Sequence, residues 1–158
     1  LRAVMRLGGP LGLVEPGVAR GIALHESFGS IVAVIAEVAA KPGEIHVRRL
    51  SGAIDCGQTV NPGIVAAQVE GGMLFGLGAA LNGDIQFDSG RPTATNFDAA
   101  PLLTLAQAPA TAVTVLPSTA APGGVGEPGT PPVAPAVANA LFIAIGKRIR
   151  DLPLIGKL

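Results

Sequence analysis

A single carboxylate stands inside a run of glycines and prolines in the C-terminal part of the sequence. The stretch reads APGGVGEPGTPP over residues 121–132, and Glu127 is its one charged residue. Glycines let other groups approach the backbone closely, and burial of a carboxyl group raises its pKa toward the range that suits a general base. Glu127 is therefore a candidate proton acceptor. An exposed loop glutamate is the simpler alternative, because loops often carry single acids.

The same stretch matches the dinucleotide-binding pattern G-x-G-x-x-G through Gly124, Gly126 and Gly129. A strand is predicted before it and a helix after it, as that pattern requires. However, Glu127 and Pro128 fill the two positions before the third glycine. A carboxylate there would repel a pyrophosphate, and proline lacks an N–H donor. No second strand with an acidic end follows the helix, so the pattern does not favour a nucleotide site.

Two polar residues interrupt the longest apolar run, residues 63–81. Gln68 and Glu70 lie there among five glycines, and buried charge is expensive in lipid, so we predict no transmembrane segment. A buried polar pair needs partners. Gln68 either donates to a ligand that the glycines allow to come close, or it belongs to a structural network between helix and sheet.

The remaining reactive side chains favour structural roles. Asp55-Cys56 suggests an acid–thiol site, but no histidine is near in sequence, so a strand-ending turn with a buried, inert cysteine is preferred. His25-Glu26 resembles the start of H-E-x-x-H, but Gly29 stands where the second histidine must be, which leaves a zinc protease unsupported. His46 lies on an alternating stretch and is interpreted as a surface or satisfied histidine.

Composition limits the classes of partner. Charged residues make up 14% of the 158 residues, against about 25% in an average domain, and eleven basic residues balance eleven acidic ones. Because the basic residues are scattered, nucleic acid is not expected as a partner. One cysteine excludes an internal disulfide and a cysteine-ligated cluster. The low charge and the start at Leu1 rather than Met predict a piece of something larger, or a subunit with covered faces.

The pattern of polar and apolar residues predicts an α+β fold, mostly antiparallel strands with two longer helices. Asn61-Pro62 and Asn82-Gly83 mark the first helix, and Gly146 ends the second. Residues 1–17 are expected to be an entry segment or linker and residues 18–154 a domain. The predicted strands are 19–28, 30–40, 44–54 and 111–117, with a turn at 41–43, a hairpin of 84–88 and 92–97, and helices over 61–81 and 131–146.

Several motifs together resemble one family. RGIALHESFGS, AIDCGQTVNP, AAQVEGGMLFGLGAAL, PGGVGEPGTPPVAPAVANAL and GKRIRDLPL occur in this order over residues 19–154. The chain resembles the C-terminal part of the large, molybdopterin-binding subunit of the xanthine dehydrogenase/aldehyde oxidase family, most of all the isoquinoline 1-oxidoreductase beta-subunit type. The resemblance implies the molybdopterin-binding C-terminal domain of that family.

The resemblance also implies roles for single residues. Glu127 matches the active-site glutamate, which takes the proton from a molybdenum-bound hydroxyl, so that water supplies the oxygen atom and hydride passes to a sulfido ligand. Gln68 matches the glutamine that contacts molybdopterin, and Val125 and Gly126 match the loop beside the cofactor. The pterin dithiolene holds the molybdenum, so no protein metal ligand is expected.

The family further implies partners. The cofactor is expected in its molybdopterin cytosine dinucleotide form, and the substrate is an N-heteroaromatic ring or an aldehyde. Electrons would leave through iron–sulfur clusters on a separate small subunit, because this chain lacks the cysteines. The remainder of the large subunit is a further expected partner, and the chain alone is expected to be inactive. A truncated structural domain that binds no cofactor is the alternative, and a nucleotide-binding module is a third.

Overall fold

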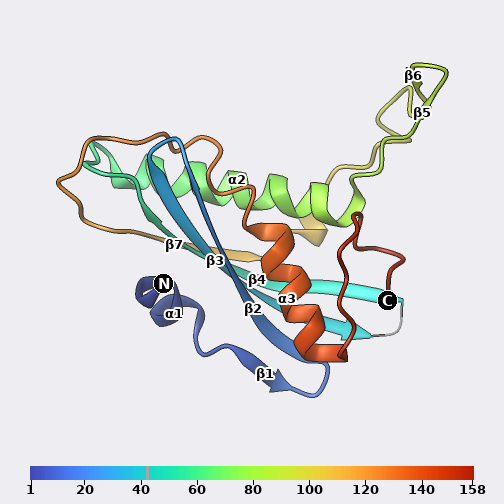
Figure 1. The fold of residues 1–158 in the computed structure, drawn as a ribbon, viewed down its shortest axis with the longest axis horizontal. Helices are drawn as coiled ribbons and strands as arrows, with labels where there is room; N and C mark the ends of the chain where they lie inside the picture. The colour runs from blue at the N-terminus through green and yellow to red at the C-terminus, as the bar shows by residue number, and fades with distance from the viewer. Residues whose placement is uncertain (42) are drawn as a thin grey trace.

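The computed structural model describes residues 1–41 and 43–158. Figure 1 shows a twisted sheet with two helices packed on one face and a short helix on the other. The elements are α1 (Arg2–Gly8), β1 (Gly12–Glu15), β2 (Val18–Ser27), β3 (Ser30–Lys41), β4 (Glu44–Asp55), α2 (Pro62–Asn82), β5 (Phe87–Asp88), β6 (Arg91–Pro92), the 3₁₀ helix η1 (Leu105–Gln107), β7 (Ala110–Val115) and α3 (Val133–Ile145).

The five-stranded sheet has the order β1-β2-β3-β4-β7. Its pairs are antiparallel except the last, because β7 runs parallel to β4. Because a strand is pleated, consecutive residues of β3 face opposite sides of the sheet. Val32 and Val34 join the main core under α2 and α3, while Ala33 and Ile35 join a smaller cluster with Val4 of α1. The predicted α+β class, mostly antiparallel with two longer helices, is confirmed.

Residues 1–17 are folded in this structure rather than extended as a plain linker. Val4 of α1 is fully buried against the sheet, and β1 pairs with the first residues of β2. Their Gly/Pro punctuation marks the turns between short elements. The division into an entry segment 1–17 and a domain 18–154 stays a prediction. Pro42, in the predicted turn at 41–43, lies outside the described residues.

The ends of the two long helices follow the predicted signals. The Asn61 side chain accepts a hydrogen bond from the backbone N–H of Ile64 at 3.2 Å, and Pro62 occupies the first turn of α2. Gly146 ends α3 in the left-handed conformation, with φ of 73°. By length and composition α2 could cross a membrane, but Val69, Met73 and other residues of one face pack into the core, as in a core helix of a folded domain.

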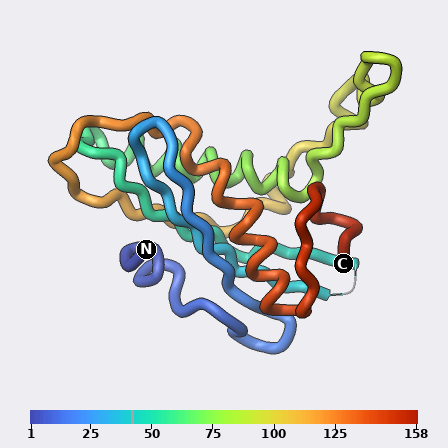
Figure 2. Tube along the Cα trace, viewed as in Figure 1, coloured from blue at the N-terminus to red at the C-terminus, as the bar shows by residue number. Residues whose placement is uncertain are grey.

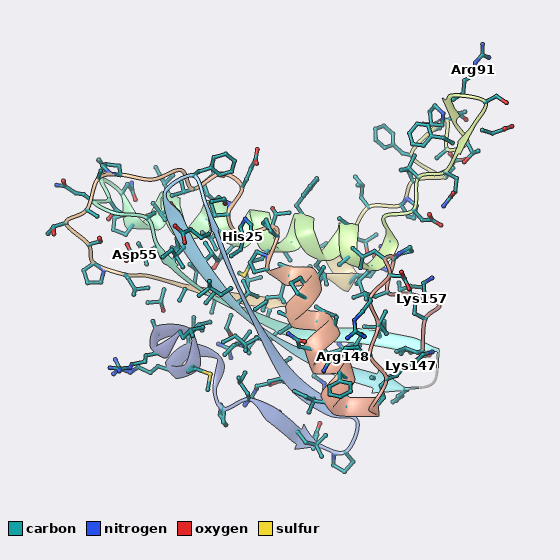
Figure 3. The ribbon with its side chains drawn as sticks, in the orientation of Figure 1. His25, Asp55, Arg91, Lys147, Arg148 and Lys157 are labelled. Carbon is teal, nitrogen blue, oxygen red and sulfur yellow. The ribbon has the colours of Figure 1, made fainter. Side chains whose placement is uncertain are left out.

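The hairpin β5–β6 is shorter than predicted and stands on an arm that extends away from the sheet (Figure 1). Each of its strands has two residues, and Arg91 lies at the tip of the arm (Figure 3). Among the described residues, the two strands pair with each other through Phe87–Pro92 and Asp88–Arg91 and with no further strand.

The segment between β7 and α3 carries Glu127 and is fastened to the turn between β2 and β3 (Figure 2). The Gly124 N–H donates to the carbonyl of Phe28 at 2.8 Å, and the Ser30 hydroxyl donates to the carbonyl of Gly124 at 2.6 Å. The Gly123 N–H donates to the carbonyl of Cys56, after β4. These bonds fix the start of the loop on the sheet.

A close helix–sheet contact lies where α3 crosses β2. A Cβ at Gly21 would stand 2.2 Å from the backbone N of Ala140 and 2.3 Å from the carbonyl O of Ala136. The Asn139 side chain also donates to the carbonyl of Ile22 at 3.0 Å. Because both contact partners of Gly21 are backbone, any side chain at this position must push the helix off the sheet.

We expect Gly21→Ala to lower the free energy of unfolding by about 2–3 kcal/mol, the cost of an overpacked core position. Gly71→Ala is the control, because a Cβ there meets nothing within 4 Å. This change in a helix interior should raise stability by up to about 1 kcal/mol. Denaturant titration of both variants measures the difference, and equal stabilities would refute the contact.

We expect Ser30→Ala to loosen the loop that carries Glu127. The hydroxyl of Ser30 is buried and donates to Gly124, so its removal should cost about 1–2 kcal/mol. Hydrogen exchange of the Gly123 and Gly124 amides should become faster. Ser89→Ala removes an exposed hydroxyl on the hairpin arm and should leave that exchange unchanged; equal effects of the two variants would contradict the anchoring role.

Candidate functional site

A cleft of about 440 Å³ opens between the first half of α2 and the loop before α3. It brings together three of the four residues that the sequence singles out for the site: Gln68, Gly126 and Glu127. Of the described residues that line it, Glu127 is the charged one. The lining consists of Gln68, Gly71, Gly72, Phe75, Gly126, Glu127, Thr130 and Pro131.

One stripe of α2 forms the first wall of the cleft. Gln68, Gly71 and Phe75 follow one another at helical spacings of three and four residues, so they share a face. All three are exposed, whereas Val69 and Met73 on the opposite side are fully buried. The core therefore fixes the rotation of the helix, and this rotation presents Gln68 to the cleft.

The loop before α3 forms the second wall of the cleft, and direct backbone contacts with α2 hold this loop in place. The Thr130 hydroxyl donates to the carbonyl of Gly72 at 3.1 Å, and a Cβ at Gly76 would stand 2.5 Å from the carbonyl O of Thr130. A Cβ at Gly129 would stand 2.8 Å from the carbonyl O of Val69. The Thr130 N–H closes a turn onto the carbonyl of Glu127 at 2.9 Å, which places Glu127 beside Gln68.

The glycines of the Glu127 loop serve two different purposes. A Cβ at Gly123 or Gly124 would collide with the β2–β3 turn, and Gly129 is required by its contact with α2. A Cβ at Gly126 or Gly71, which both line the cleft, would meet nothing within 4 Å. Packing therefore explains most of these glycines. The interpretation that the glycines make room for a ligand stays a prediction, and it applies to Gly71 and Gly126.

The two polar groups of the cleft are exposed. Glu127 is open, as in the simpler alternative of an exposed loop glutamate, and not the partly dry base that was also considered; of the polar pair that was interpreted as buried, Gln68 is exposed and Glu70 is half-buried. Within the described residues the Gln68 amide makes no hydrogen bond to the sheet, so the structural network is not formed. Val125 is half-buried against the main core and does not line the cleft.

The other candidate groups lie outside the cleft. Cys56 is buried, and burial, with the charge of Asp55 as a second cause, raises the pKa of its thiol. A raised pKa keeps the thiol protonated at neutral pH, which fits the predicted inert cysteine. His25 is half-buried on β2, and His46 is exposed on β4. Over residues 1–41 and 43–158, no group of three or more His, Cys, Asp and Glu side chains is placed to hold a metal ion.

The C-terminal basic residues make contacts within the chain (Figure 3). The Arg148 guanidinium lies 3.6 Å from the centre of the Phe142 ring, a cation–π geometry, and donates to the Asn139 side chain at 3.1 Å. The Lys147 ammonium donates to the carbonyl of Lys157. These side chains fasten the C-terminal segment onto the end of α3.

Sequence reasoning missed Phe75, Thr130 and Pro131 as residues of the cleft. Phe75 could have been found from its spacing, since it lies seven residues after Gln68 on the same helical face. Thr130 and Pro131 follow Glu127 in the turn that packs on α2, and no periodic pattern marks them.

The cleft suits a group that brings its own metal ligands. The Gln68 amide offers a donor and an acceptor, Glu127 offers a proton acceptor, and the open positions at Gly71 and Gly126 allow close approach. The volume lies within the range of small-molecule and cofactor sites, about 300–1,000 Å³. The residues present therefore fit a cofactor that is held by hydrogen bonds rather than by protein metal ligands.

The chain is similar to parts of longer known proteins. The membrane-bound aldehyde dehydrogenase (pyrroloquinoline-quinone) of Gluconacetobacter polyoxogenes is 37% identical over 120 residues, which cover 70% of this chain and 16% of that protein. The isoquinoline 1-oxidoreductase subunit beta of Brevundimonas diminuta is 34% identical over 140 residues, covering 87% of this chain and 18% of that subunit.

The fold also matches a solved structure. Quinoline 2-oxidoreductase from Pseudomonas putida 86 superposes with a TM-score of 0.68 at 24% identity, over 79% of this chain and 17% of that one. The chain thus spans less than a fifth of the length of each of these relatives. The family model described as the molybdopterin cofactor-binding domain matches residues 21–109, more than half of the chain, and this range includes Gln68. The chain therefore belongs to the molybdopterin cofactor-binding domain family and is a part of a xanthine dehydrogenase/aldehyde oxidase type protein, as its motifs indicate.

Proposed function

We propose that this chain supplies the base and one side of the cofactor site of a molybdenum hydroxylase that oxidises an aldehyde or an N-heteroaromatic compound. The observation that carries the proposal is the cleft in which Gln68 and Glu127, far apart in sequence, face the same space. Family membership supports molybdopterin as the ligand of that space. The names of the relatives support the substrate class, since they refer to an aldehyde and to isoquinoline.

Gln68 and the open glycines would hold the cofactor. The Gln68 amide is exposed to the cleft and can donate to, and accept from, a pterin edge. Gly71 and Gly126 leave the backbone accessible, so a planar ring system can approach the cleft walls. Val125, half-buried against the core, would anchor the loop behind Gly126. When bound, the cofactor supplies a molybdenum centre that accepts two electrons, and water is the source of the oxygen.

Glu127 would act as the general base at its carboxylate oxygen. The turn from Glu127 to Thr130 and the contact of Thr130 with Gly72 hold the carboxylate at the cleft wall. Closure of the cleft by the cofactor and the rest of the subunit would remove water around it, and a carboxylate with fewer solvating waters is a stronger proton acceptor.

Other components complete the proposed enzyme. The chain spans less than a fifth of its relatives, so the remainder of the large subunit would form the other side of the site. Cys56 is the one cysteine of the chain, so iron–sulfur clusters for electron transfer would lie outside it, on the small partner subunit that the family resemblance implies. The cytosine dinucleotide form of molybdopterin belongs to the same proposal.

We expect Glu127→Gln in the intact enzyme to keep the molybdenum content and to lower kcat at least about 100-fold, because general bases contribute about 10²–10⁴-fold. Metal analysis and steady-state rates measure both quantities. Glu26→Gln changes an exposed glutamate outside the cleft and should keep the rate. An unchanged turnover of Glu127→Gln would refute the role of the base.

We expect Gln68→Leu to weaken cofactor binding about fivefold, and so to lower the molybdenum and pterin bound per protein at limiting cofactor, because a single well-placed hydrogen bond contributes on the order of 1 kcal/mol. Gln86→Leu, on the hairpin arm, serves as the control. Metal and pterin analysis of the wild-type enzyme also separates the alternatives. Pyrroloquinoline quinone without molybdenum, or no cofactor at all, would overturn the proposal in favour of another cofactor or of a structural domain.

A further inference from the structure

The turn between β2 and β3 holds a bulky residue in a backbone conformation that its side chain disfavours. Phe28 has φ of 54° and Gly29 has φ of 73°, and together they close the hairpin in which Ser27 pairs with Ser30. The left-handed region is an outlier for a bulky side chain, whereas glycine and asparagine enter it readily. Residues held there cluster at functional sites, where the surrounding structure enforces the conformation.

The same turn contains a second unfavourable group. The Ser27 hydroxyl is buried and has no hydrogen-bond partner among the described residues, and a buried hydroxyl without a partner lowers stability. Across the turn, Ser30 is fully buried and its hydroxyl donates to the carbonyl of Gly124 at 2.6 Å. Two costly features thus lie beside a bond to the loop that carries Glu127.

The loop and the turn fit together backbone to backbone (Figure 2). The Gly124 N–H donates to the carbonyl of Phe28 at 2.8 Å. A Cβ at Gly124 would stand 2.9 Å from the Cβ of Phe28, and a Cβ at Gly123 would stand 2.6 Å from the carbonyl O of Gly29. Rotation of the turn out of the left-handed region would therefore move both hydrogen-bond partners of Gly124, the Phe28 carbonyl and the Ser30 hydroxyl.

Glu127 lies on a short span between two fixed points. On one side Gly124 is bonded to the turn, and on the other Gly129 packs on the backbone of α2. Residues 125–128 separate these points, and Pro128 among them has a fixed φ. A span this short has little slack, so displacement of the turn displaces the carboxylate.

We propose that the β2–β3 turn positions the Glu127 carboxylate and that Phe28, through its left-handed conformation, is a positioning residue for the base. This inference rests on the proposed function. Phe28 is not part of the lining of the cleft that contains Gln68 and Glu127, so it acts through the loop. A shift of about 1 Å at a reacting group can lower the rate about 10²-fold, so the turn can control kcat from outside the cleft.

The test changes the turn conformation in the intact enzyme, assayed with benzaldehyde and with isoquinoline. Phe28→Val introduces a β-branched side chain that is strongly disfavoured at positive φ. We expect kcat to fall at least about tenfold, because the base is misplaced, with KM and molybdenum content unchanged. Phe28→Asn introduces a residue that tolerates the left-handed region and should keep kcat within about twofold of wild type. Steady-state rates and metal analysis measure these quantities.

Two further variants make the result specific. Ser89→Val is the matched control, because Ser89 and Gly90 also have positive φ, 49° and 78°, in the turn of the hairpin arm; it should keep kcat. Gly124→Ala disturbs the junction from the loop side, since its Cβ would press on Phe28. It should lower kcat as Phe28→Val does, and it decides the question if Phe28→Val does not fold. Hydrogen exchange over residues 121–130 should be faster in Gly124→Ala and unchanged in Phe28→Asn.

Each other outcome overturns the inference. An unchanged kcat in Phe28→Val or Gly124→Ala shows that the base does not depend on the turn. An equal loss in Phe28→Asn and Phe28→Val shows that the phenyl group is needed rather than the turn conformation. A raised KM at unchanged kcat assigns the turn to substrate binding, and a loss of molybdenum assigns it to cofactor retention. Failure of the proposed function is separate, because then the wild-type enzyme oxidises neither substrate, or Glu127→Gln retains its rate.

Discussion

Backbone meets backbone where the loop before α3 crosses the middle of α2, and the candidate site depends on this contact. Thr130 lies so close to Gly76 that a methyl group between them would stand 2.5 Å from a carbonyl oxygen. Gly129 meets the carbonyl of Val69 in the same way. Side chains of any size at these glycines would separate the two segments. Glu127 would then leave the wall that faces Gln68, although neither residue had itself been changed.

This constraint gives the glycine pattern of the loop a physical reading. The spacing of Gly124, Gly126 and Gly129 matches a phosphate-binding pattern, yet a different structural feature accounts for each glycine. Gly124 packs on Phe28, which itself adopts a positive φ of 54° in the β2–β3 turn. Gly129 packs on α2, and Gly126 alone among the three faces open space. Two independent packing contacts around one open position are enough to produce the motif without any phosphate.

Local sequence signals predicted the individual helices and strands better than they predicted which elements pair or pack together. Alternation predicted the strand at 44–54, and Asn61 and Gly146 predicted helix ends, because these signals act within a few residues. The parallel pairing of β7 with β4 and the docking of α1 through Val4 depend on contacts between distant segments. The residues of a short strand do not identify the strand with which it pairs, so these features could not be predicted from the sequence.

The site shows the same division. The types and motifs of Gln68 and Glu127 could be recognised, but their shared cleft arises from the way α2 is rotated by its buried face. The apolar composition of α2 obscured that rotation: with few polar residues on either side, the sequence does not tell which face the core covers. This is why Gln68 was expected to be buried although it is exposed. It is also why no exposed position was predicted for Phe75, which by type is an ordinary core residue.

Exposure of so many apolar groups in a chain with 14% charged residues follows from its place in a larger protein. A domain that completes its own core leaves its charges outside, but this chain leaves Phe75, Leu102 and Leu105 outside instead. The part of the chain that matches its relatives covers less than a fifth of their length, so further surface is available to cover it. The exposure of Glu127 then has a physical explanation. Under the proposed function, the loop would hold the carboxylate on one wall, and the cofactor and the rest of the subunit would exclude water from the other. Placement of the base would then come from this chain, and the dry environment that strengthens it would come from assembly.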